Sequence, residues 1–391
     1  MTERLYESNA YDVAFDARVT EVRAGEGVSF VTLDRTLFFP EEGGQSCDRG
    51  TLAGFPVTDV QIKGGEIVHT VQGSVLPGTE VHGEIDWEYR FRNMQMHSGE
   101  HVFSGLVFRL FGYSNVGFHL SENSATMDYN GKLTADDIEM LEERANRIIT
   151  EGHAIRAWYP SKEELAALSY RSKKEIDGPV RLVEIEGTDL CACCVPHLRN
   201  TSEIGFLKII SFENYKGGVR LQYRCGLRAL DHYRDCLSLL TAAGRLLSAK
   251  QEDIPAAIER VQEEAKNLAF RLSEAVRMEI ADKIRRQYEA DSRNDSSNGN
   301  ALFVFHAEPG LLRFAMDEAR KHYSGICVIL IPQEGGRVRY LMEGSEQVSE
   351  LQNGLRERFG AKGGGAKGSV SGSTEASEEQ LRGFFSEQGI G

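Results

Sequence analysis

The sequence predicts an α+β protein in four consecutive parts: a small N-terminal β-barrel, an α+β domain, a helical spacer and a small C-terminal α/β domain. Three observations support this class. Short β-branched runs fill residues 1–88, helix and strand patterns mix over 89–228, and a long helical periodicity runs from 229 to 290. Residues 300–391 return to mixed strands and helices, and a length of 391 residues suits several domains.

The N-terminal part contains segments that alternate apolar and polar residues or run β-branched. Clear examples are 28–33, 57–62 and 67–71, and glycine or aspartate turns separate them. We expect 81–86 to be the last strand. Several short strands at this spacing predict a small barrel.

The second part mixes the two periodicities. Residues 92–111 are a helix candidate, and Thr134 opens a second helix with a sequence close to a capping box. Ser161 starts a short third helix. Strands are expected at 181–185 and 206–212, which gives this part its α+β character.

Residues 229–290 are predicted to be helical, with a break near Lys250 and a new start at Asp253 and Pro255. Apolar residues then recur at a 3-4-3-4 spacing typical of a coiled coil. They are Ile258, Val261, Ala265, Leu268, Leu272 and Ala275. This seam fits a helical hairpin packed on itself and the pairing of two chains equally well.

The C-terminal part follows a polar linker at 291–300. Buried-type strands are expected at 302–305 and 326–331, and a glycine-rich loop at 359–373. In this loop Lys362 and Lys367 flank three glycines, and backbone amides beside lysines can hold phosphate. A flexible tail explains the same composition, but the local basic charge favours RNA contact.

Composition limits the class of protein. Apolar residues make up 41% and charged residues 27% of the chain, which is ordinary for a globular protein. We find no apolar run of about 18 residues and no secretory signal, so we expect no membrane partner. The net charge of −14 argues against non-specific coating of nucleic acid. Three of the seven cysteines crowd into 191–194, which favours metal binding and a reducing cytoplasm.

Two pairs of metal-type ligands lie almost a hundred residues apart. His97 and His101 are four residues apart in a predicted helix and therefore share one face. Cys193 and His197 have the same spacing and add a thiolate and a third imidazole. Either pair alone commonly lies on the surface or in the core of a protein without binding a metal. Together, three imidazoles and one thiolate suit tetrahedral zinc.

Three neighbouring residues have weaker claims. Cys191 and Cys194 are competing thiol ligands, but Cys193 alone has the four-residue relation to His197. Glu100 lies between the two helical histidines but a quarter turn off their face. We therefore expect Glu100 to face solvent or to support a ligand.

Gly43, Gly44 and Gln45 form the second notable motif, after an aromatic-proline approach at 38–40. Two glycines let a backbone approach a ligand closely, and a glutamine offers both a donor and an acceptor. A plain hairpin turn explains a Gly-Gly pair as well. The sequence therefore leaves both interpretations open.

Together, the His-x-x-x-His and Cys-x-x-x-His pairs and the Gly-Gly-Gln motif resemble the editing domain of alanyl-tRNA synthetase and the freestanding AlaX trans-editing proteins. Residues 200–205 and 223–229 resemble further segments of that domain. Residues 300–391 resemble the synthetase's C-terminal tRNA-binding domain, so the long AlaX form fits best. Two departures concern the pocket wall. Cys194, Val195 and Pro196 replace the family's Gly-Gly-Thr, and Glu42 replaces the first of its three glycines.

The resemblance implies a zinc-dependent deacylase that acts in trans on mischarged tRNA(Ala). An alanine pocket excludes neither glycine nor serine well, so Ser-tRNA(Ala), and also Gly-tRNA(Ala), are the expected substrates. The implied residues are His97, His101, Cys193 and His197 for metal, His97, His101 and Gln45 for catalysis, Gly43, Gly44, Gln45 and His119 for substrate, and Lys362, Gly363, Gly364, Gly365 and Lys367 for tRNA.

Several points stay open at this stage. Zinc either activates a water molecule or only shapes the pocket. The alternatives are a zinc-stabilised tRNA-binding or scaffold protein without turnover, and a small-molecule metallohydrolase. Nothing in the first 85 residues resembles an ATP-dependent aminoacylation domain, so the chain is not expected to charge tRNA. A homodimer through the helical region or the C-terminal domain is a further expectation.

Overall fold

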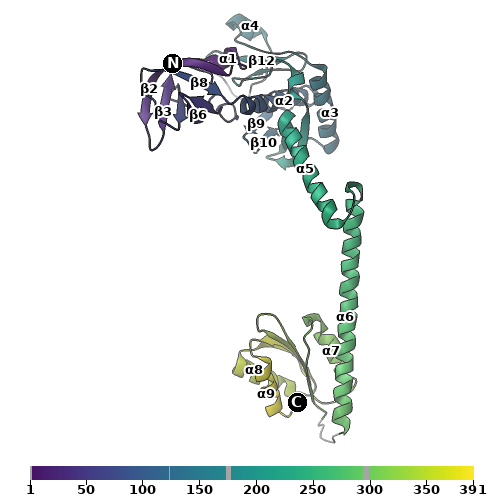
Figure 1. The fold of residues 1–391 in the computed structure, drawn as a ribbon. Coiled ribbons are helices and arrows are strands. Elements are labelled where there is room, and N and C mark those ends of the chain that lie inside the picture. The colour runs from purple at the N-terminus through teal and green to yellow at the C-terminus, as the bar shows by residue number, and fades with distance from the viewer. Residues whose placement is uncertain (1, 123, 173–177, 294–298) are drawn as a thin grey trace. The chain divides into compact units, whose positions relative to one another are not determined.

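The computed structural model describes residues 2–122, 124–172, 178–293 and 299–391. The chain forms two compact units, Met1–Ala242 and Ala243–Gly391 (Figure 1). Helices and several β-sheets make up the chain, which confirms the α+β class. The division at residues 88, 228 and 300 stays a prediction. Among the described helices, none is both long and apolar enough to cross a lipid bilayer.

The first unit begins with a closed barrel in the strand order β2-β3-β7-β6-β5-β8. The elements up to this point are β1 (Glu3–Arg4), α1 (Leu5–Ser8), β2 (Ala14–Ala24), β3 (Ser29–Leu33), β4 (Arg35–Thr36), β5 (Gly50–Leu52), β6 (Phe55–Lys63), β7 (Glu66–Val71) and β8 (Glu80–Ile85). Burial alternates strictly along β8, which is the strand expected at 81–86. Because strand side chains alternate between faces, this alternation turns Val81 and Ile85 into the barrel core.

The rest of the first unit combines two sheets with helices. Its elements are α2 (Trp87–Phe111), β9 (Asn115–Leu120), β10 (Ala125–Tyr129), α3 (Ala135–Glu151), β11 (Ile155–Trp158), α4 (Lys162–Ala167), β12 (Leu182–Ile185), β13 (Asp189–Ala192), η1 (Thr201–Ile204), β14 (Leu207–Tyr215), β15 (Gly218–Cys225) and α5 (Gly226–Leu247), the last of which runs into the second unit. One sheet has the order β14-β15-β10-β9 and the other β11-β12-β13. The helix α2 contacts β13, β15, β9 and α3.

Helix α2 begins at the Asp86 cap, whose carboxylate accepts the backbone N–H of Tyr89 at 3.0 Å. It ends at Gly112, which takes a left-handed conformation with φ of 70°. Residues Asn93 to Val107 of this helix are all buried, polar ones included. A helix without a solvent face needs a partner for each buried polar group, and these partners build the site described below.

The two other helix starts expected in this unit are present. Thr134 caps α3 and Ser161 caps α4, each in a reciprocal capping box with an acidic residue three positions later. The capping signal therefore placed both starts at the correct residue.

The second unit contains a long helix and a small α/β domain. Its elements are η2 (Gln251–Asp253), α6 (Ile254–Arg293), β16 (Ala301–Val304), η3 (Pro309–Leu311), α7 (Leu312–Ala319), β17 (Cys327–Pro332), β18 (Val338–Glu343), α8 (Gln347–Phe359), β19 (Lys362–Ala366), β20 (Ser369–Thr374) and α9 (Glu378–Glu387). The sheet order is β16-β17-β18-β20-β19, with β16 and β17 parallel.

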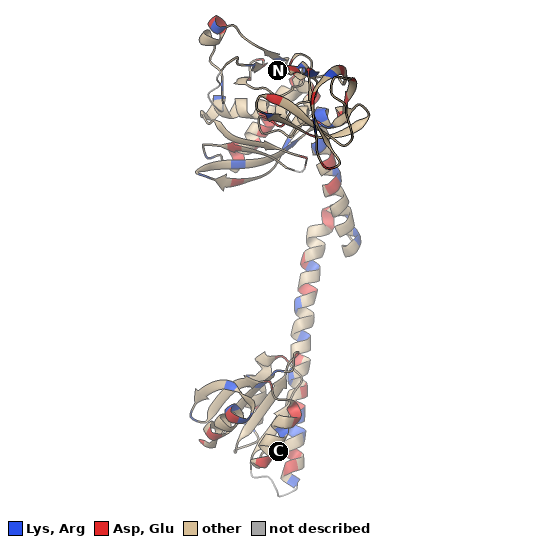
Figure 2. Ribbon diagram, turned by 90° about the vertical axis from the view of Figure 1, so that its left-hand side faces the viewer, with Lys and Arg blue, Asp and Glu red and all other residues tan. Residues whose placement is uncertain are grey.

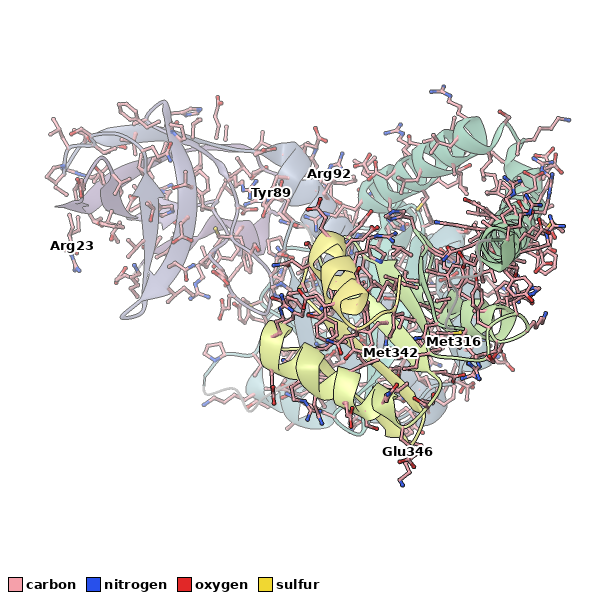
Figure 3. All side chains as sticks on the ribbon, turned by 90° about the horizontal axis from the view of Figure 1, so that it is seen from below. Arg23, Tyr89, Arg92, Met316, Met342 and Glu346 are labelled. Atoms are coloured by element: carbon pink, nitrogen blue, oxygen red, sulfur yellow. The ribbon has the colours of Figure 1, made fainter. Side chains whose placement is uncertain are left out.

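Helices cover both faces of this sheet. One core contains residues of α8 and α9 with Met342 of β18, and the other contains residues of α6 and α7, including Met316 (Figure 3). Ile280 and Ile284 are the α6 residues in the second core. The C-terminal half of α6 is therefore part of the domain.

Three sequence-based expectations need correction in this unit. The glycine-rich segment at 359–373 is not a loop, because β19 and β20 pair as an antiparallel hairpin that turns at Lys367 and Gly368. Of the linker expected at 291–300, residues 291–293 continue α6, and 294–298 lie outside the described residues. The seam of α6 is not packed in a hairpin, because all six seam residues are exposed.

Candidate metal centre

The four candidate ligands lie together, although one pair comes from a helix and the other pair from a loop. His97 and His101 lie one turn apart on α2, as expected. Cys193 and His197 lie in a loop after β13 and not on a helix. Arg181 holds this loop, because its guanidinium donates to the carbonyl oxygens of Cys193 and Val195 at 3.0 Å each. The loop geometry, and not helical spacing, brings the second pair together.

Ligand atoms of the four side chains all lie within 4.8 Å of one another. The Cys193 sulfur is 3.6 Å from Nε2 of His97 and 3.4 Å from Nε2 of His197. In a tetrahedral zinc site the bond lengths of about 2.3 Å to sulfur and 2.05 Å to nitrogen separate these atoms by about 3.6 Å. The donor set therefore fits zinc in both chemistry and size. Cys193 is the least buried of the four, so the cluster faces outward on its side.

A polar group fixes the outer nitrogen of each imidazole. Nδ1 of His97 lies 3.1 Å from Oε1 of Gln45, and Nδ1 of His101 lies 3.0 Å from Oδ2 of Asp189. The third contact joins Nδ1 of His197 to the Ser98 hydroxyl at 3.0 Å. An oxygen acceptor at Nδ1 holds the proton there and leaves Nε2 free to bind a metal.

The ionisation of the cluster suits a metal cation. Burial raises the pKa of the Cys193 thiol, but the imidazoles of His97 and His197 outweigh it and bring the pKa well below its usual value. The thiolate is the form that binds metal. Burial lowers the pKa of His197 to about 3. Burial also lowers the pKa of His101, but the hydrogen bond to Asp189 and the interactions with Cys193 together outweigh it and raise the pKa to about 9. A metal competes with that proton for Nε2.

The two other thiols in this region are poorer ligands. Burial raises the pKa of both Cys191 and Cys194, which keeps them protonated. Cys191 does lie in a second group with His101 and Asp189. Both oxygens of that aspartate are already bonded, however, because Arg171 and His101 donate to them.

The Gly-Gly-Gln segment is bonded to the end of β9. The backbone N–H of Leu120 donates to the Gly44 carbonyl at 2.7 Å, and that of Ser46 donates to the Leu120 carbonyl at 3.0 Å. Gly44 has φ of 81°, and a Cβ there would lie 2.4 Å from the Phe118 carbonyl oxygen. This glycine is therefore needed for close contact with the chain's own backbone.

Gln45 is buried, with 2% of its surface exposed. Its carbonyl oxygen is used by His97, which fixes the orientation of the amide. The contact with His97 uses only the oxygen of the amide, so it leaves the NH₂ group available as a donor. Gln45 therefore supports a ligand and still carries a donor for another molecule.

Two other residues near the pair of histidines had open or untested expectations. Of the two places expected for Glu100, the structure shows the one beside a ligand and not the one facing solvent, because Glu100 is 1% exposed and its Oε2 lies 3.9 Å from Nε2 of His101. Its Oε1 accepts hydrogen bonds from Ser104 and Asn115. Phe118 places its ring 4.7 Å from that of His97, measured between centroids. His119, the next residue in β9, is exposed and points to the other face of the strand. The structure thus does not bring His119 to the cluster, and its role stays a prediction.

The residues expected to bind tRNA lie on β19 and the following turn. Gly363, Gly364 and Gly365 are in the strand, at the edge of the sheet. Lys362 is exposed, and Lys367 forms an exposed ion pair with Glu346 at 3.1 Å. Their part in tRNA binding stays a prediction.

Two family models match the first unit. The second additional domain of threonyl and alanyl tRNA synthetases matches residues 180–221, which include Cys193 and His197. The class II (A) tRNA synthetases match residues 7–89. The match shows a likeness to a synthetase family at this end of the chain. The expectation that the first 85 residues contain no ATP-dependent aminoacylation domain stays a prediction. Those residues fold here as the barrel and the start of α2.

Similar proteins extend the likeness to the whole chain. The alanyl-tRNA editing protein AlaX-L of Pyrococcus horikoshii is 29% identical, over 97% of this chain and 96% of its own length. The chain resembles the long AlaX-type editing proteins. The alanyl-tRNA editing protein Aarsd1 of Danio rerio is 28% identical over 88% of this chain and 84% of its own length. The alanine–tRNA ligase of Ignicoccus hospitalis is 34% identical over 70% of this chain, which spans 31% of that ligase.

Sequence reasoning missed three groups behind the ligands, namely Ser98, Asp189 and Arg171. Ser98 lies inside the His-x-x-x-His motif, and Asp189 lies four residues before Cys193, which is the same spacing as that of Cys193 and His197 and was the signal that could have found it. Arg171 is farther from the motifs in sequence and gave no signal. The available clue to Ser98 was the large number of polar residues in α2. They lie on several faces of this helix, including faces that do not bind the metal.

Proposed function

We propose that this protein hydrolyses the ester bond of mischarged tRNA(Ala) in trans, with Ser-tRNA(Ala) as the preferred substrate and Gly-tRNA(Ala) as a second one. The observation that carries the proposal is the converging set of three imidazoles and one thiolate, each imidazole fixed from behind. The likeness to two alanyl-tRNA editing proteins over most of the chain supports it.

His97, His101, Cys193 and His197 would hold the metal, which we take to be zinc. When bound, zinc would supply positive charge that attracts the amino nitrogen, the hydroxyl oxygen or the carbonyl oxygen of the substrate. The four protein ligands complete a tetrahedral set, as in sites where zinc has a structural role. We therefore infer that zinc shapes the pocket.

Gln45 then has a direct part in the reaction. The contact of its oxygen with His97 fixes the amide of this buried residue, and the NH₂ group of the amide is a donor. We propose that this donor binds the ester carbonyl oxygen and stabilises the negative charge that develops there during hydrolysis. Removing one such donor slows related reactions by roughly 100- to 1000-fold. Gly44 positions Gln45 through its hydrogen bond with Leu120 of β9. A side chain at Gly43 would meet Val195 in the loop after β13, so this glycine lets the two segments lie close together.

The direct test incubates the purified protein with Ser-tRNA(Ala), Gly-tRNA(Ala) and Ala-tRNA(Ala). We expect the seryl ester to be hydrolysed fastest and the alanyl ester to stay as stable as in buffer. Gln45→Ala should lower the maximal rate, with bound zinc unchanged or slightly reduced. Seryl ester that persists with the wild-type protein would sink the proposal. Turnover of free amino-acid esters alone would instead indicate a small-molecule hydrolase, and tRNA binding without turnover a scaffold.

We propose that the C-terminal domain contributes tRNA affinity. Lys362 is exposed beside the glycine-rich edge strand, where backbone approach is unobstructed at Gly364. Phosphate contacts of this kind position a nucleic acid without reading its sequence. Lys362→Ala should therefore raise KM and weaken salt-sensitive tRNA binding while the maximal rate changes little. An unchanged KM would remove this strand from the tRNA path.

We also propose that α6 pairs two copies of the chain in antiparallel orientation. Of the seam residues, Leu268 and Leu272 are 62% and 66% exposed. An antiparallel copy centred between residues 266 and 267 brings Leu268 opposite Ala265, so that a large residue faces a small one. The same arrangement brings Glu264 near Arg271 of the second copy. Both charge signs line α6 (Figure 2), which permits such cross-pairing.

The dimer is tested by light scattering. Leu268→Asp should give monomers, because it places a charge in the seam. Phe270→Asp is the matched control, because Phe270 is exposed to a similar extent, at 67%, but lies off the seam. A monomeric wild-type protein, or equal effects of the two substitutions, would contradict pairing through the seam.

A further inference from the structure

The three imidazoles of the metal centre differ in the groups that hold them. Gln45 and Ser98 offer neutral oxygens to His97 and His197, whereas Asp189 offers a carboxylate oxygen to His101. A hydrogen bond to a charged acceptor is roughly twice as strong as a neutral one. The orientation of His101 therefore depends on Asp189 more than the other rings depend on their partners.

Asp189 is itself held by a charged partner. Arg171 Nε donates to Oδ1 and Nη2 donates to Oδ2, both at 2.7 Å. The side chains are 10% and 2% exposed, so this ion pair is almost fully buried. A two-point bond of this kind fixes both the distance and the plane of the carboxylate. Removing one partner of a buried pair leaves an uncompensated charge, which proteins tolerate poorly.

The backbone places Arg171 beside the strand that carries Asp189. The Arg171 N–H donates to the Leu190 carbonyl at 2.8 Å, and the Ala192 N–H donates to the Arg171 carbonyl at 2.9 Å. These bonds form an isolated parallel bridge to Cys191. The backbone of Arg171 is therefore tied to β13, which leads directly into the Cys193 loop.

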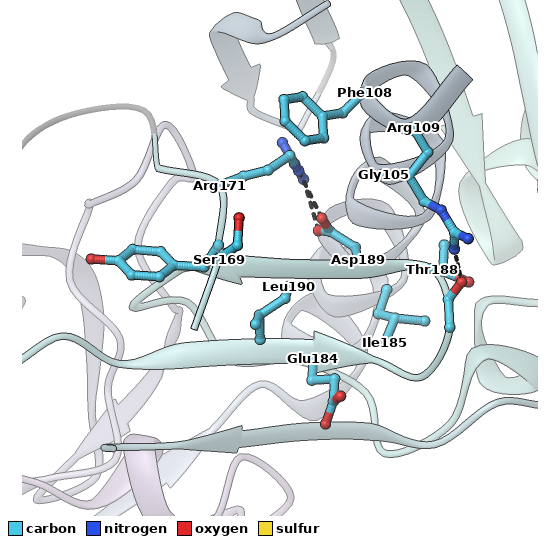
Figure 4. A pocket seen from close by; sticks show the side chains of 12 residues that line it. Gly105, Phe108, Arg109, Ser169, Arg171, Glu184, Ile185, Thr188, Asp189 and Leu190 are labelled. Carbon is cyan, nitrogen blue, oxygen red and sulfur yellow. Dashed lines mark hydrogen bonds and ion pairs between the residues drawn. The ribbon is translucent and has the colours of Figure 1, made fainter. Parts of the chain in front are cut away.

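A cavity gives small molecules access to the ion pair of Arg171 and Asp189 without passing through the metal centre. It lines a cavity of about 280 Å³ between the C-terminal half of α2, β12 and β13. Figure 4 shows the Arg171 guanidinium bonded to Asp189, with Phe108 and Arg109 of α2 nearby. Truncation of Arg171 would thus enlarge a space that small molecules can enter.

We propose that Arg171 is a positioning residue of the metal centre, which keeps the Asp189 carboxylate against Nδ1 of His101 and so keeps Nε2 of His101 directed at the metal. The inference rests on the metal site of the proposed function. Groups behind metal ligands typically change metal affinity by roughly 10- to 100-fold when they are removed. We expect an effect of this size for Arg171→Ala.

The test measures zinc affinity by competition with a chromophoric chelator, without tRNA. The matched control is Arg220→Ala, because Arg220 binds Asp128 through the same two atoms at 2.7 Å each. This second pair lies between β15 and β10 and touches none of the four ligands. We expect Arg171→Ala to lose zinc affinity by roughly 10- to 100-fold, while Arg220→Ala keeps the wild-type value.

Chemical rescue separates positioning from folding. Guanidinium ion at millimolar concentration should restore zinc affinity to Arg171→Ala, because it can replace the missing group beside the cavity, whereas ammonium should not. Equal zinc affinity in wild type and Arg171→Ala, equal loss in both arginine variants, or a loss that guanidinium does not restore would each overturn the inference. Because zinc is measured directly, these outcomes are distinct from a failure of tRNA deacylation.

Discussion

Gly105 offers a sharp test of how α2 and β13 together hold the metal centre. It lies on α2 one turn after His101. A Cβ at this position would lie 2.8 Å from the Asp189 Cβ and 2.8 Å from the Thr188 carbonyl oxygen. The perturbation is Gly105→Ala, which adds one methyl group at the contact between the helix and the strand.

Two effects of opposite sign follow. Alanine favours a helix interior over glycine by about 1 kcal/mol. Against this, ordinary contacts begin at 3.4 Å, so strand and helix must separate by about 0.6 Å. Overpacking of this kind costs about 1–3 kcal/mol. The same movement lengthens the 3.0 Å bond between His101 and Asp189 toward about 3.6 Å, which is outside hydrogen-bonding range. The unfavourable effects are larger.

We therefore expect Gly105→Ala to lower both the melting temperature and the zinc affinity. Gly383→Ala is the control, because Gly383 lies in the helix α9 with no atom near its added Cβ. This control should show only the stabilisation that alanine gives to a helix, as a higher melting temperature, and its zinc affinity should equal that of the wild type. The reasoning is refuted if Gly105→Ala binds zinc as tightly as wild type and melts at the same or a higher temperature.

Three further outcomes are expected. Cys193→Ala should reduce zinc from one to none per chain by elemental analysis, whereas Cys194→Ala should keep one. Ser98→Ala should weaken zinc binding less than Asp189→Asn in chelator competition, because Ser98 offers only a neutral oxygen. Burial lowers the pKa of His69 to about 4 from its ordinary 6.5, so the stability that its neutral form contributes is complete above pH 6.5 and is lost as pH falls toward 4. Urea unfolding should show the advantage of wild type over His69→Gln shrinking by up to about 3 kcal/mol across that window; a gap independent of pH would contradict this.

Local signals in the sequence determined much of this protein. Capping residues placed the starts of α3 and α4, because a cap is satisfied within one turn of the chain. The four-residue spacing of His97 and His101 placed both on one face of α2 for the same local reason. The alternation along β8 told which side chains fill the barrel.

Contacts between distant segments decided the rest. Cys193 and His197 lie in a loop that Arg181 holds, and not on a helix. The four-residue spacing therefore did not predict the geometry of this pair. The run at 359–373 resembles a loop by composition, but pairing along β20 makes it a strand. Arg171 carries no spacing signal, and the four-residue spacing of Asp189 to Cys193 does not reveal its contact with His101, because that contact depends on β13 passing within contact distance of α2 at Gly105. Local propensity is set by neighbours in sequence, whereas the bonds that orient a metal ligand come from whichever chain segment the fold packs against it.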